Sequence, residues 1–262
     1  MILMKKHIEK LKKYFKSFDY KHNKLTVIVY VLLRVAVLTA LVLNLLKGEY
    51  ENVFLCVLTL FLFLMPFIIE EQFNISISPS MQIIILLFIF SAEILGEIQS
   101  FYLKFEYWDV ILHTINGFLM GAIGFSLIDL LNTSEKISIK LTPFFVVFTA
   151  FCFSMTIGVM WEFFEFGMDK ILLTDTQKDT WVETVRTVEF GETNKVETFN
   201  IDSVEVNGKK WPGYLDIGLN DTMNDMIVNF LGAITFSVLG YISLIKRGKQ
   251  GIEKLLIVKR ET

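Results

Sequence analysis

Six long apolar runs, separated by polar segments, dominate the hydrophobic pattern of the chain. A helix rises about 1.5 Å per residue, so each run can cross about 30 Å of hydrocarbon, although the second is short and would stand nearly upright. The pattern predicts an all-α polytopic integral membrane protein with six transmembrane helices in a bundle. The predicted spans are residues 25–46, 53–69, 81–99, 109–131, 143–166 and 222–245.

Composition agrees with a membrane protein. Hydrophobic residues make up 53% of the 262 residues, with 25 Phe and only 4 Pro, and soluble domains do not contain repeated apolar stretches of about 20 residues. Both cysteines, Cys56 and Cys152, lie inside apolar runs and are interpreted as small buried hydrophobic residues. The net charge of −3 gives no indication of nucleic-acid binding, and no early apolar run ends in a signal-peptide cleavage pattern.

The basic residues predict the orientation of the spans. Residues 1–24 carry eight Lys and residues 246–262 carry six Lys or Arg, and an even number of spans places both ends on one side. With Lys136 and Lys140, that side holds sixteen basic residues, against only Lys47 and Lys104 in the short loops opposite. The positive-inside rule therefore predicts that both termini are cytoplasmic.

Three segments flank the spans of the membrane domain, which covers residues 25–245. The sequence of residues 1–24 predicts either a basic amphipathic helix that lies on the inner leaflet or a positively charged flank with no binding role of its own. Residues 246–262 form a basic cytoplasmic tail. The extracytoplasmic loop 167–221 holds eleven acidic and six basic residues, and its β-branched stretches with an Asn207-Gly208 turn signal indicate either a small hairpin-like cap or a disordered loop.

Polar residues inside the predicted spans gather at one depth. With the predicted topology, each set lies near the outer end of its helix, within about 10 Å of the outer boundary by helix rise. The sets also keep to helix faces that carry small residues, which let helix backbones approach closely. We therefore expect them to point into the bundle. The acidic members are Glu93, Glu97, Asp109, Glu162, Glu165, Asp169, Asp221 and Asp225, with His113, Asn116 and Asn229 at similar depth.

This concentration of carboxylates in a membrane requires compensation. A single charge costs about 2.5–3.5 kcal/mol on insertion scales, and like charges repel. The acids would be protonated and hydrogen-bonded to each other, or solvated in a cleft, or bound to a divalent cation. Taken alone, Asp109 and Asp221 could equally be helix N-caps. The candidate assignments are acid–base residues His113 and Asp109, metal ligands Glu162, Glu165, Asp225 and Glu93, and binding residues Asn116, Asp169, Asp221 and Asn229.

Three motifs in these helices carry a family resemblance. WDVILHTINGF at 108–118, WEFFE at 161–165 and DTMNDMIVNFLGA at 221–233 resemble the YjdF-like group of uncharacterised bacterial inner-membrane proteins. More distantly they resemble the VanZ-like family, which is associated with glycopeptide resistance. The VanZ-like pattern is Asp-x3-His, then Glu-x2-Gln, then Asp-x3-Asn-x2-Gly-Ala, on three successive helices.

The match to that pattern is incomplete. Glu165 stands where the pattern has Gln, and the long loop 170–220 departs from the shorter connections of those families. The resemblance, over about residues 105–235, implies a fold and a site location but no reaction. The residues that match are Asp109, His113, Glu162, Asp225, Asn229, Gly232 and Ala233.

Three functional hypotheses fit this sequence. The first is a pocket, open to the outside, that binds or processes a lipid-linked or cell-envelope molecule with a divalent cation. The second is a small proton- or cation-coupled transporter, because intramembrane carboxylates and His also build relays. The third is a structural membrane protein whose acids lock helices together. The sequence names no substrate, oligomeric state or nucleophile, and leaves open whether the protein is an enzyme.

Overall fold

The computed structural model describes residues 24–132, 140–191, 194–247 and 252–259. The predicted amphipathic segment 1–24 lies almost entirely outside these ranges. Two compact units are formed, and each is described by itself below. Among the described residues, the first unit is built from those in the ranges 24–108, 125–132, 140–146, 239–247 and 252–259. The second is built from those in the ranges 109–124, 147–191 and 194–238.

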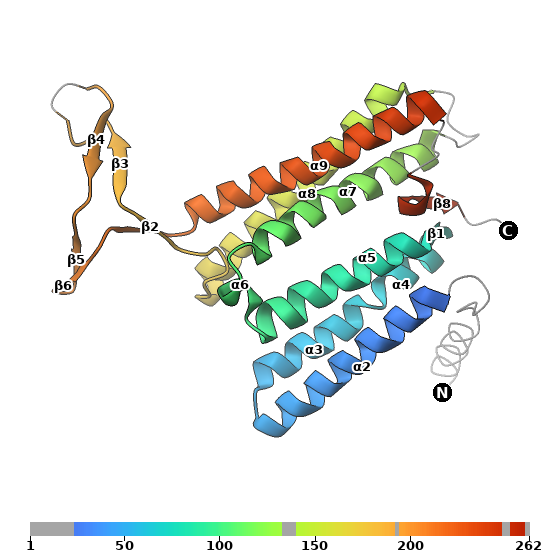
Figure 1. Ribbon diagram of the computed structural model, residues 1–262, viewed down its shortest axis with the longest axis horizontal. Helices are drawn as coiled ribbons and strands as arrows, with labels where there is room; N and C mark the ends of the chain where they lie inside the picture. Colours follow the sequence, from blue (N-terminus) through green and yellow to red (C-terminus); the bar gives the residue numbers. More distant parts are fainter. Residues whose placement is uncertain (1–23, 133–139, 192–193, 248–251, 260–262) are drawn as a thin grey trace. The chain divides into compact units, whose positions relative to one another are not determined.

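Within the described residues, six helical stretches are long and apolar enough to cross a membrane, which confirms the predicted multi-pass helical architecture (Figure 1). The sides on which the termini lie remain a prediction. The stretches are α2 (Lys24–Lys47), α3 with α4 (Tyr50–Leu62 and Met65–Phe73), α5 with η1 (Pro79–Phe90 and Ser91–Ile98), α7 (Trp108–Asn132), α8 (Pro143–Leu172) and α9 (Leu219–Arg247).

The second stretch corrects the prediction of a short upright helix at 53–69. It extends over Tyr50–Phe73 and is interrupted between α3 and α4, where Pro66 occupies the first turn of α4. Proline is tolerated there because the backbone N–H that it lacks would have no acceptor within the helix. The residues beyond 69 were missed because Glu70 and Glu71 end the apolar run while the helix continues. Elsewhere, α8 begins at Pro143 as predicted.

The third stretch changes its winding near its end. The α-helix α5 passes at Ser91 into the π-helix η1, which ends at Ile98 and carries Glu93. π-helical turns within longer helices are rare. Those that do occur are often found at functional sites. The short helix α6 (Phe101–Lys104) then leads toward α7.

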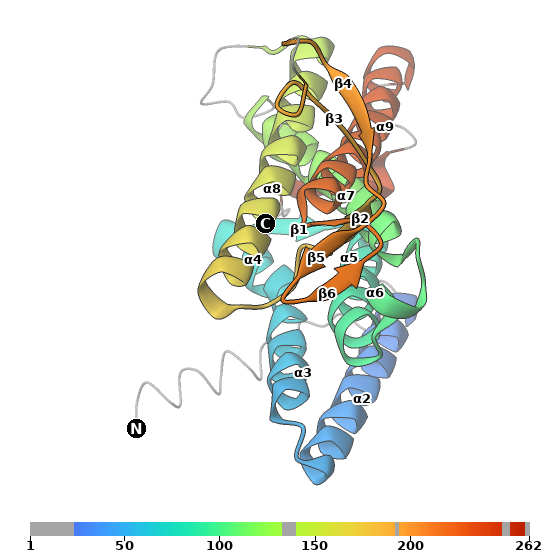
Figure 2. The same cartoon turned by 90° about the vertical axis from the view of Figure 1, so that its left-hand side faces the viewer.

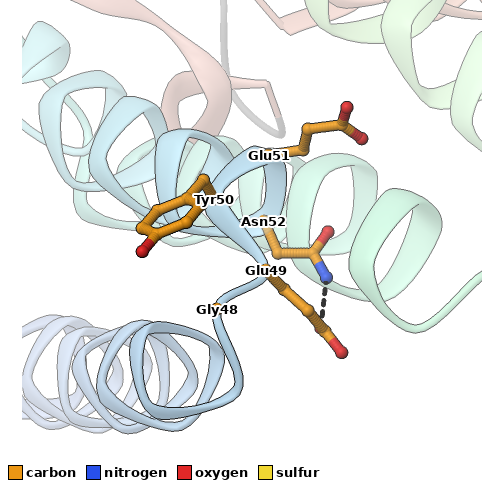
Figure 3. Close-up of a pocket in the computed structure, with 5 residues that line it drawn as sticks. All are labelled: Gly48, Glu49, Tyr50, Glu51 and Asn52. Atoms are coloured by element: carbon orange, nitrogen blue, oxygen red, sulfur yellow. Dashed lines mark hydrogen bonds between the residues drawn. The ribbon is translucent and has the colours of Figure 1, made fainter.

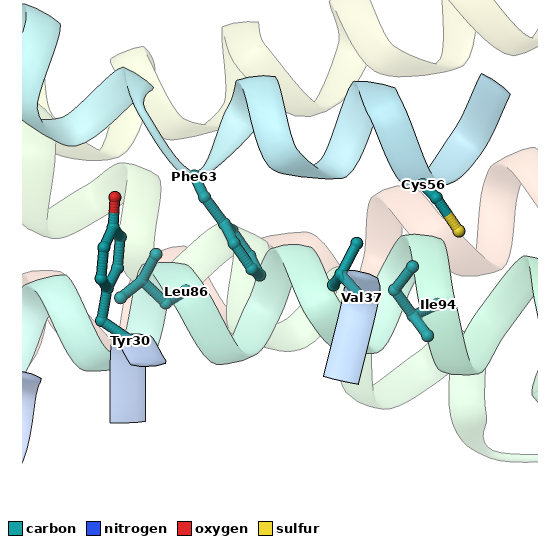
Figure 4. Packing of buried hydrophobic residues seen from close by; sticks show 6 residues of the cluster. All are labelled: Tyr30, Val37, Cys56, Phe63, Leu86 and Ile94. Carbon is teal, nitrogen blue, oxygen red and sulfur yellow. The ribbon is translucent and has the colours of Figure 1, made fainter. Parts of the chain in front are cut away.

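The first unit has an apolar core between α2, α3, α5 and η1 (Figure 4). Val37 and Cys56 are fully buried, which confirms the interpretation of Cys56 as a small core residue. Arg34, in the middle of α2, places its guanidinium 4.2 Å from the ring centre of Tyr30. The core residues drawn in Figure 4 are Tyr30, Val37, Cys56, Phe63, Leu86 and Ile94.

Residues 252–259, in the predicted basic tail, form secondary structure. Strand β8 (Ile257–Lys259) pairs antiparallel with β1 (Ile75–Ile77), after the 3-10 helix η2 (Glu253–Leu255). Ser126 accepts the backbone N–H of Ile257 at 3.0 Å. This pairing requires the segment between α4 and α5 and the tail to lie on the same side of the spans, as the predicted topology has them.

In the second unit, small residues allow α7, α8 and α9 to pack closely. A Cβ added to Gly117 would collide with the backbone carbonyl of Asn229, and one added to Gly232 would collide with that of Thr114. Ser154 on α8 donates to the carbonyl of Gly117 at 2.7 Å. The small residues that the sequence placed on shared faces therefore lie at helix contacts.

The loop between α8 and α9 carries six short strands, which favours the hairpin interpretation over a disordered loop. β2 (Thr180–Val182) pairs with β7 (Tyr214–Asp216). Between them lie the hairpins β3–β4 (Thr184–Thr187 and Glu197–Asn200) and β5–β6 (Val204–Val206 and Lys209–Trp211), visible in Figures 1 and 2. Asn207 and Gly208, with φ of 53° and 78°, form the predicted turn between β5 and β6.

Candidate metal centre

The centre begins on the first turns of α7. Asp109 and His113 are four residues apart, so the helix places them on one face. Nε2 of His113 lies 3.5 Å from Oδ1 of Asp109, and only 8% of His113 is exposed. The four-residue spacing in the sequence thus brings the carboxylate of Asp109 close to the imidazole of His113.

The neighbouring helices bring two further carboxylates to the same imidazole. Nδ1 of His113 lies 3.8 Å from Oε1 of Glu162 on α8, and Nε2 lies 3.8 Å from Oδ2 of Asp225 on α9. These separations are too long for direct hydrogen bonds. They match two ligand atoms that each lie about 2.1 Å from a common ion, since such atoms are separated by about 3–4 Å.

Two groups of potential ligands occur among the described residues. Within each group, the ligand atoms lie within 4.8 Å of one another. Asp225 belongs to both groups. The first group is His113, Glu162, Glu165 and Asp225, and the second is Asp109, Asp221 and Asp225.

Three carboxylate oxygens in the first group are buried without a hydrogen-bond partner. They are Oε2 of Glu162, Oε2 of Glu165 and Oδ2 of Asp225. Glu162 is 5% exposed and Asp225 is 3% exposed. Leaving such an oxygen unpaired costs about 1–3 kcal/mol, and more when the group is charged. A bound cation would supply the missing partner for all three.

Two predicted binding residues support the centre from the side. Asn116 on α7 donates to Oδ1 of Asn229 on α9 at 3.1 Å, and Nδ2 of Asn229 lies 3.7 Å from the sulfur of Met155 on α8. Asn229 is 1% exposed and also packs against Gly158. The contacts of Asn229 join α7, α8 and α9 one helical turn after Asp225 along α9. They therefore help to position the carboxylates on these helices.

The loop segment that follows α8 is anchored to acidic residues of both neighbouring helices. Asp169 accepts the backbone N–H groups of Thr176 at 2.6 Å and Gln177 at 2.9 Å. Asp221 accepts the N–H of Lys178 through Oδ2 at 2.7 Å. Asp169 belongs to neither ligand group, and its hydrogen bonds instead hold the loop segment against the end of α8. Nothing in the sequence pattern singled out Thr176, Gln177 or Lys178 as its partners.

The same loop segment is itself acidic. Asp179 is exposed, and slight desolvation of its carboxyl, together with the charges of Asp175, Asp216 and Asp169, raises its pKa. Repulsion between these carboxylates also favours the approach of a cation.

Glu93, the remaining predicted ligand, lies in η1 of the first unit. Its convergence with the residues of the second unit stays a prediction. The first unit also has a pocket of about 360 Å³ at the turn between α2 and α3, drawn in Figure 3. There Asn52 donates to Oε2 of Glu49 at 2.9 Å, and no residue assigned to the centre from the sequence lines it.

Comparison with known proteins yields a family without an assigned activity. The sequence profile described as "Predicted membrane protein (DUF2238)" matches residues 28–246. A relative described as "Uncharacterized protein", from Thermotoga maritima, is 24% identical over 177 residues, which cover 67% of this chain and 69% of the relative. No solved structure matches this chain.

Proposed function

The chain belongs to the DUF2238 family of predicted membrane proteins, and we propose that it binds a divalent cation through His113, Glu162, Glu165 and Asp225. One observation carries the proposal. Four ligand atoms from three helices lie within 4.8 Å of one another, and buried oxygens of Glu162, Glu165 and Asp225 have no hydrogen-bond partner. A cation would neutralise charge that otherwise carries a large desolvation cost.

The donor set favours particular ions. Imidazole is a good ligand for Zn²⁺ and Fe²⁺, whereas carboxylates also suit Mn²⁺ and Mg²⁺. One imidazole among three carboxylates therefore favours Mn²⁺, Fe²⁺ or Zn²⁺ over Ca²⁺. Carboxylates and histidines projecting from facing helices hold such ions in the cores of helical bundles.

The bound ion would act on a lipid-linked or cell-envelope molecule in the outer half of a bacterial cytoplasmic membrane. The predicted topology and the membrane position of the ligands support this location. In an enzyme of this kind the ion would polarise an anionic oxygen of the substrate, and Asp109, which is not among the four ligands of that ion, would exchange a proton with a bound water.

The proposal is tested on the full chain purified in detergent. Stripped protein is titrated with Mn²⁺ or Zn²⁺ while metal content and melting temperature are measured. A cation at about 100 times its Kd should add about 2.7 kcal/mol of stability, and a chelator should remove it. The Glu162→Gln, Asp225→Asn double variant should lose both effects, while Asp202→Asn, in an exposed loop position, should retain them. Wild-type melting that is indifferent to every divalent cation would refute the proposal.

A proton relay is the second candidate, and one feature favours it. The two ring nitrogens of His113 face carboxylates of different helices, Glu162 through Nδ1 and Asp225 through Nε2. Such an arrangement can pass a proton through one imidazole. Proton uptake by reconstituted vesicles, abolished in His113→Gln and independent of metal, would favour the relay over the metal centre.

A purely structural role for the acids receives less support. The Asn116–Asn229 contact and the close approach at Gly117 already join α7 to α9. Unpaired buried oxygens on Glu162 and Asp225 do not strengthen a helix contact. The structural hypothesis predicts that neutral amide variants of these acids lower the free energy of unfolding by about 0.6–2 kcal/mol, the usual contribution of a membrane hydrogen bond, without a selective loss of activity.

A further inference from the structure

The carboxylate of Asp225 belongs to both ligand groups of the second unit. A carboxylate has two oxygens, and each can coordinate a separate ion. Asp225 is 3% exposed, its Oδ2 has no hydrogen-bond partner, and that atom lies 3.8 Å from Nε2 of His113. The most buried acid of the cluster is therefore placed where two coordination spheres would meet.

The helices stack the other ligands in two layers. Asp109 precedes His113 by four residues on α7, and Asp221 precedes Asp225 by four residues on α9. Four residues rise about 6 Å along a helix. His113 and Asp225 thus lie in one layer with the acids of α8, and Asp109 and Asp221 lie in the next layer toward the ends of their helices. Two layers joined by one shared carboxylate therefore offer a separate set of ligands to each of two ions.

Charge balance favours two ions over one. The two groups contain five carboxylates, Asp109, Glu162, Glu165, Asp221 and Asp225, and one imidazole. With all five carboxylates ionised, a single divalent ion would leave about three negative charges uncompensated in a region of low dielectric constant, where like charges repel strongly. A second divalent ion brings the cluster close to neutrality.

The second group is also held in place by the loop. Oδ2 of Asp221 accepts the N–H of Lys178, and the neighbouring Gln177 side chain donates to the hydroxyl of Thr222. These contacts fix the carboxylate of Asp221 at the start of α9. Oδ1 of Asp109 lies 3.5 Å from Nε2 of His113, so the second group adjoins the first directly.

We propose that the protein holds a dinuclear divalent-metal centre, in which Asp225 bridges two ions. His113, Glu162 and Glu165 complete the first ion's coordination, and Asp109 with Asp221 bind the second. The inference rests on the proposed function, because the first ion is the one proposed there. Paired ions about 3.5–4 Å apart act on both the attacking and the leaving oxygen of a phosphate ester. A lipid-linked phosphate is therefore the substrate class that such a centre would take.

The test counts ions in the full chain purified in detergent and loaded with Mn²⁺. The expected result is about two Mn²⁺ per chain by elemental analysis, with an electron paramagnetic resonance spectrum of exchange-coupled ions. The Asp109→Asn, Asp221→Asn double variant should bind about one Mn²⁺ and show the spectrum of an isolated ion, because the first group keeps its four ligands. Asp202→Asn, at an exposed position, should behave as the wild type.

The outcomes separate the two proposals. One Mn²⁺ per wild-type chain, with an uncoupled spectrum, overturns the dinuclear centre and leaves the single-ion proposal standing. Failure of the wild type to bind Mn²⁺, Fe²⁺ or Zn²⁺ overturns both. The wild-type spectrum decides the question even if the double variant does not fold, since coupled and isolated ions are distinguished without it.

Discussion

Nδ1 of His113 lies 3.8 Å from Oε1 of Glu162, although the two residues are 49 positions apart on different helices. Neither atom forms a direct hydrogen bond with the other at that distance. The imidazole instead occupies a position from which it can share an ion or a proton with α8. This relationship makes His113 the most informative residue to change.

Replacing His113 by Gln should remove a metal ligand while keeping a polar side chain of similar size. We expect the Kd for Mn²⁺ or Zn²⁺ to rise by at least about tenfold, since even the loss of an outer-shell partner costs 10–100-fold. The far-ultraviolet circular dichroism and the elution volume in detergent should not change. Isothermal titration of stripped protein measures the affinity, with Glu106→Gln, an exposed carboxylate ahead of α7, as the control. Equal affinities in His113→Gln and the control would remove His113 from the ligand set.

Close packing at Gly117 gives a prediction for stability. A Cβ at this position would collide with the backbone carbonyl of Asn229, which cannot move without shifting α9. We expect Gly117→Ala to lower the free energy of unfolding by about 1–3 kcal/mol, the usual cost of overpacking. Chemical denaturation in detergent, followed by circular dichroism, measures the change.

Gly167 on α8 provides a matched control for that variant. A Cβ there would meet no heavy atom within 4 Å. Alanine is favoured over glycine in a helix by about 1 kcal/mol, so Gly167→Ala should be neutral or stabilising. Similar destabilisation by both variants would show that the loss does not come from the α7–α9 contact.

The close approach of the acids and His113 on α7 and α9 was predictable because their signal is periodic. Asp109 with His113 and Asp221 with Asp225 recur at the four-residue spacing of a helix face, and the apolar runs around them fix the helix. The six helical stretches followed from the same runs. The contact of Asn116 with Asn229 was not predictable in detail, since it depends on how two distant helices pack.

Other features leave no periodic signal. The π-helix at Ser91–Ile98 depends on a local change of winding that side-chain type does not encode. The pairing of β8 with β1 involves three-residue strands far apart in the chain, too short for an alternating pattern. The anchoring of Thr176 to Asp169 likewise depends on loop geometry.

The acidic loop predicts a pH effect that the Asp179→Asn variant should remove. Slight desolvation, then repulsion from Asp175 and Asp216, raises the folded-state pKa of the exposed Asp179 above its unfolded value. A raised carboxyl pKa means that the folded state binds the proton more tightly, so stability is lost as the pH rises from the unfolded to the folded pKa. At neutral pH, Asp179→Asn should therefore slow amide hydrogen exchange in β2 and β7, which pair beside it. Near pH 3 the variant and the wild type should exchange alike, and a difference that persists there would exclude ionisation as the cause.

The predicted orientation of the spans is tested by the accessibility of single cysteines. With Cys56 and Cys152 replaced by alanine, Asn194→Cys, in the loop between β3 and β4, should react with a membrane-impermeant thiol reagent added to intact cells. Lys140→Cys, exposed ahead of α8, should react only after the cells are made permeable, because sixteen basic residues predict that its side is cytoplasmic. The cysteine-free parent should not react in either condition. Labelling of Lys140→Cys in intact cells, with Asn194→Cys protected, would reverse the orientation. It would place the cluster of His113, Glu162 and Asp225 in the inner half of the membrane, and a substrate in the outer leaflet could then no longer be proposed.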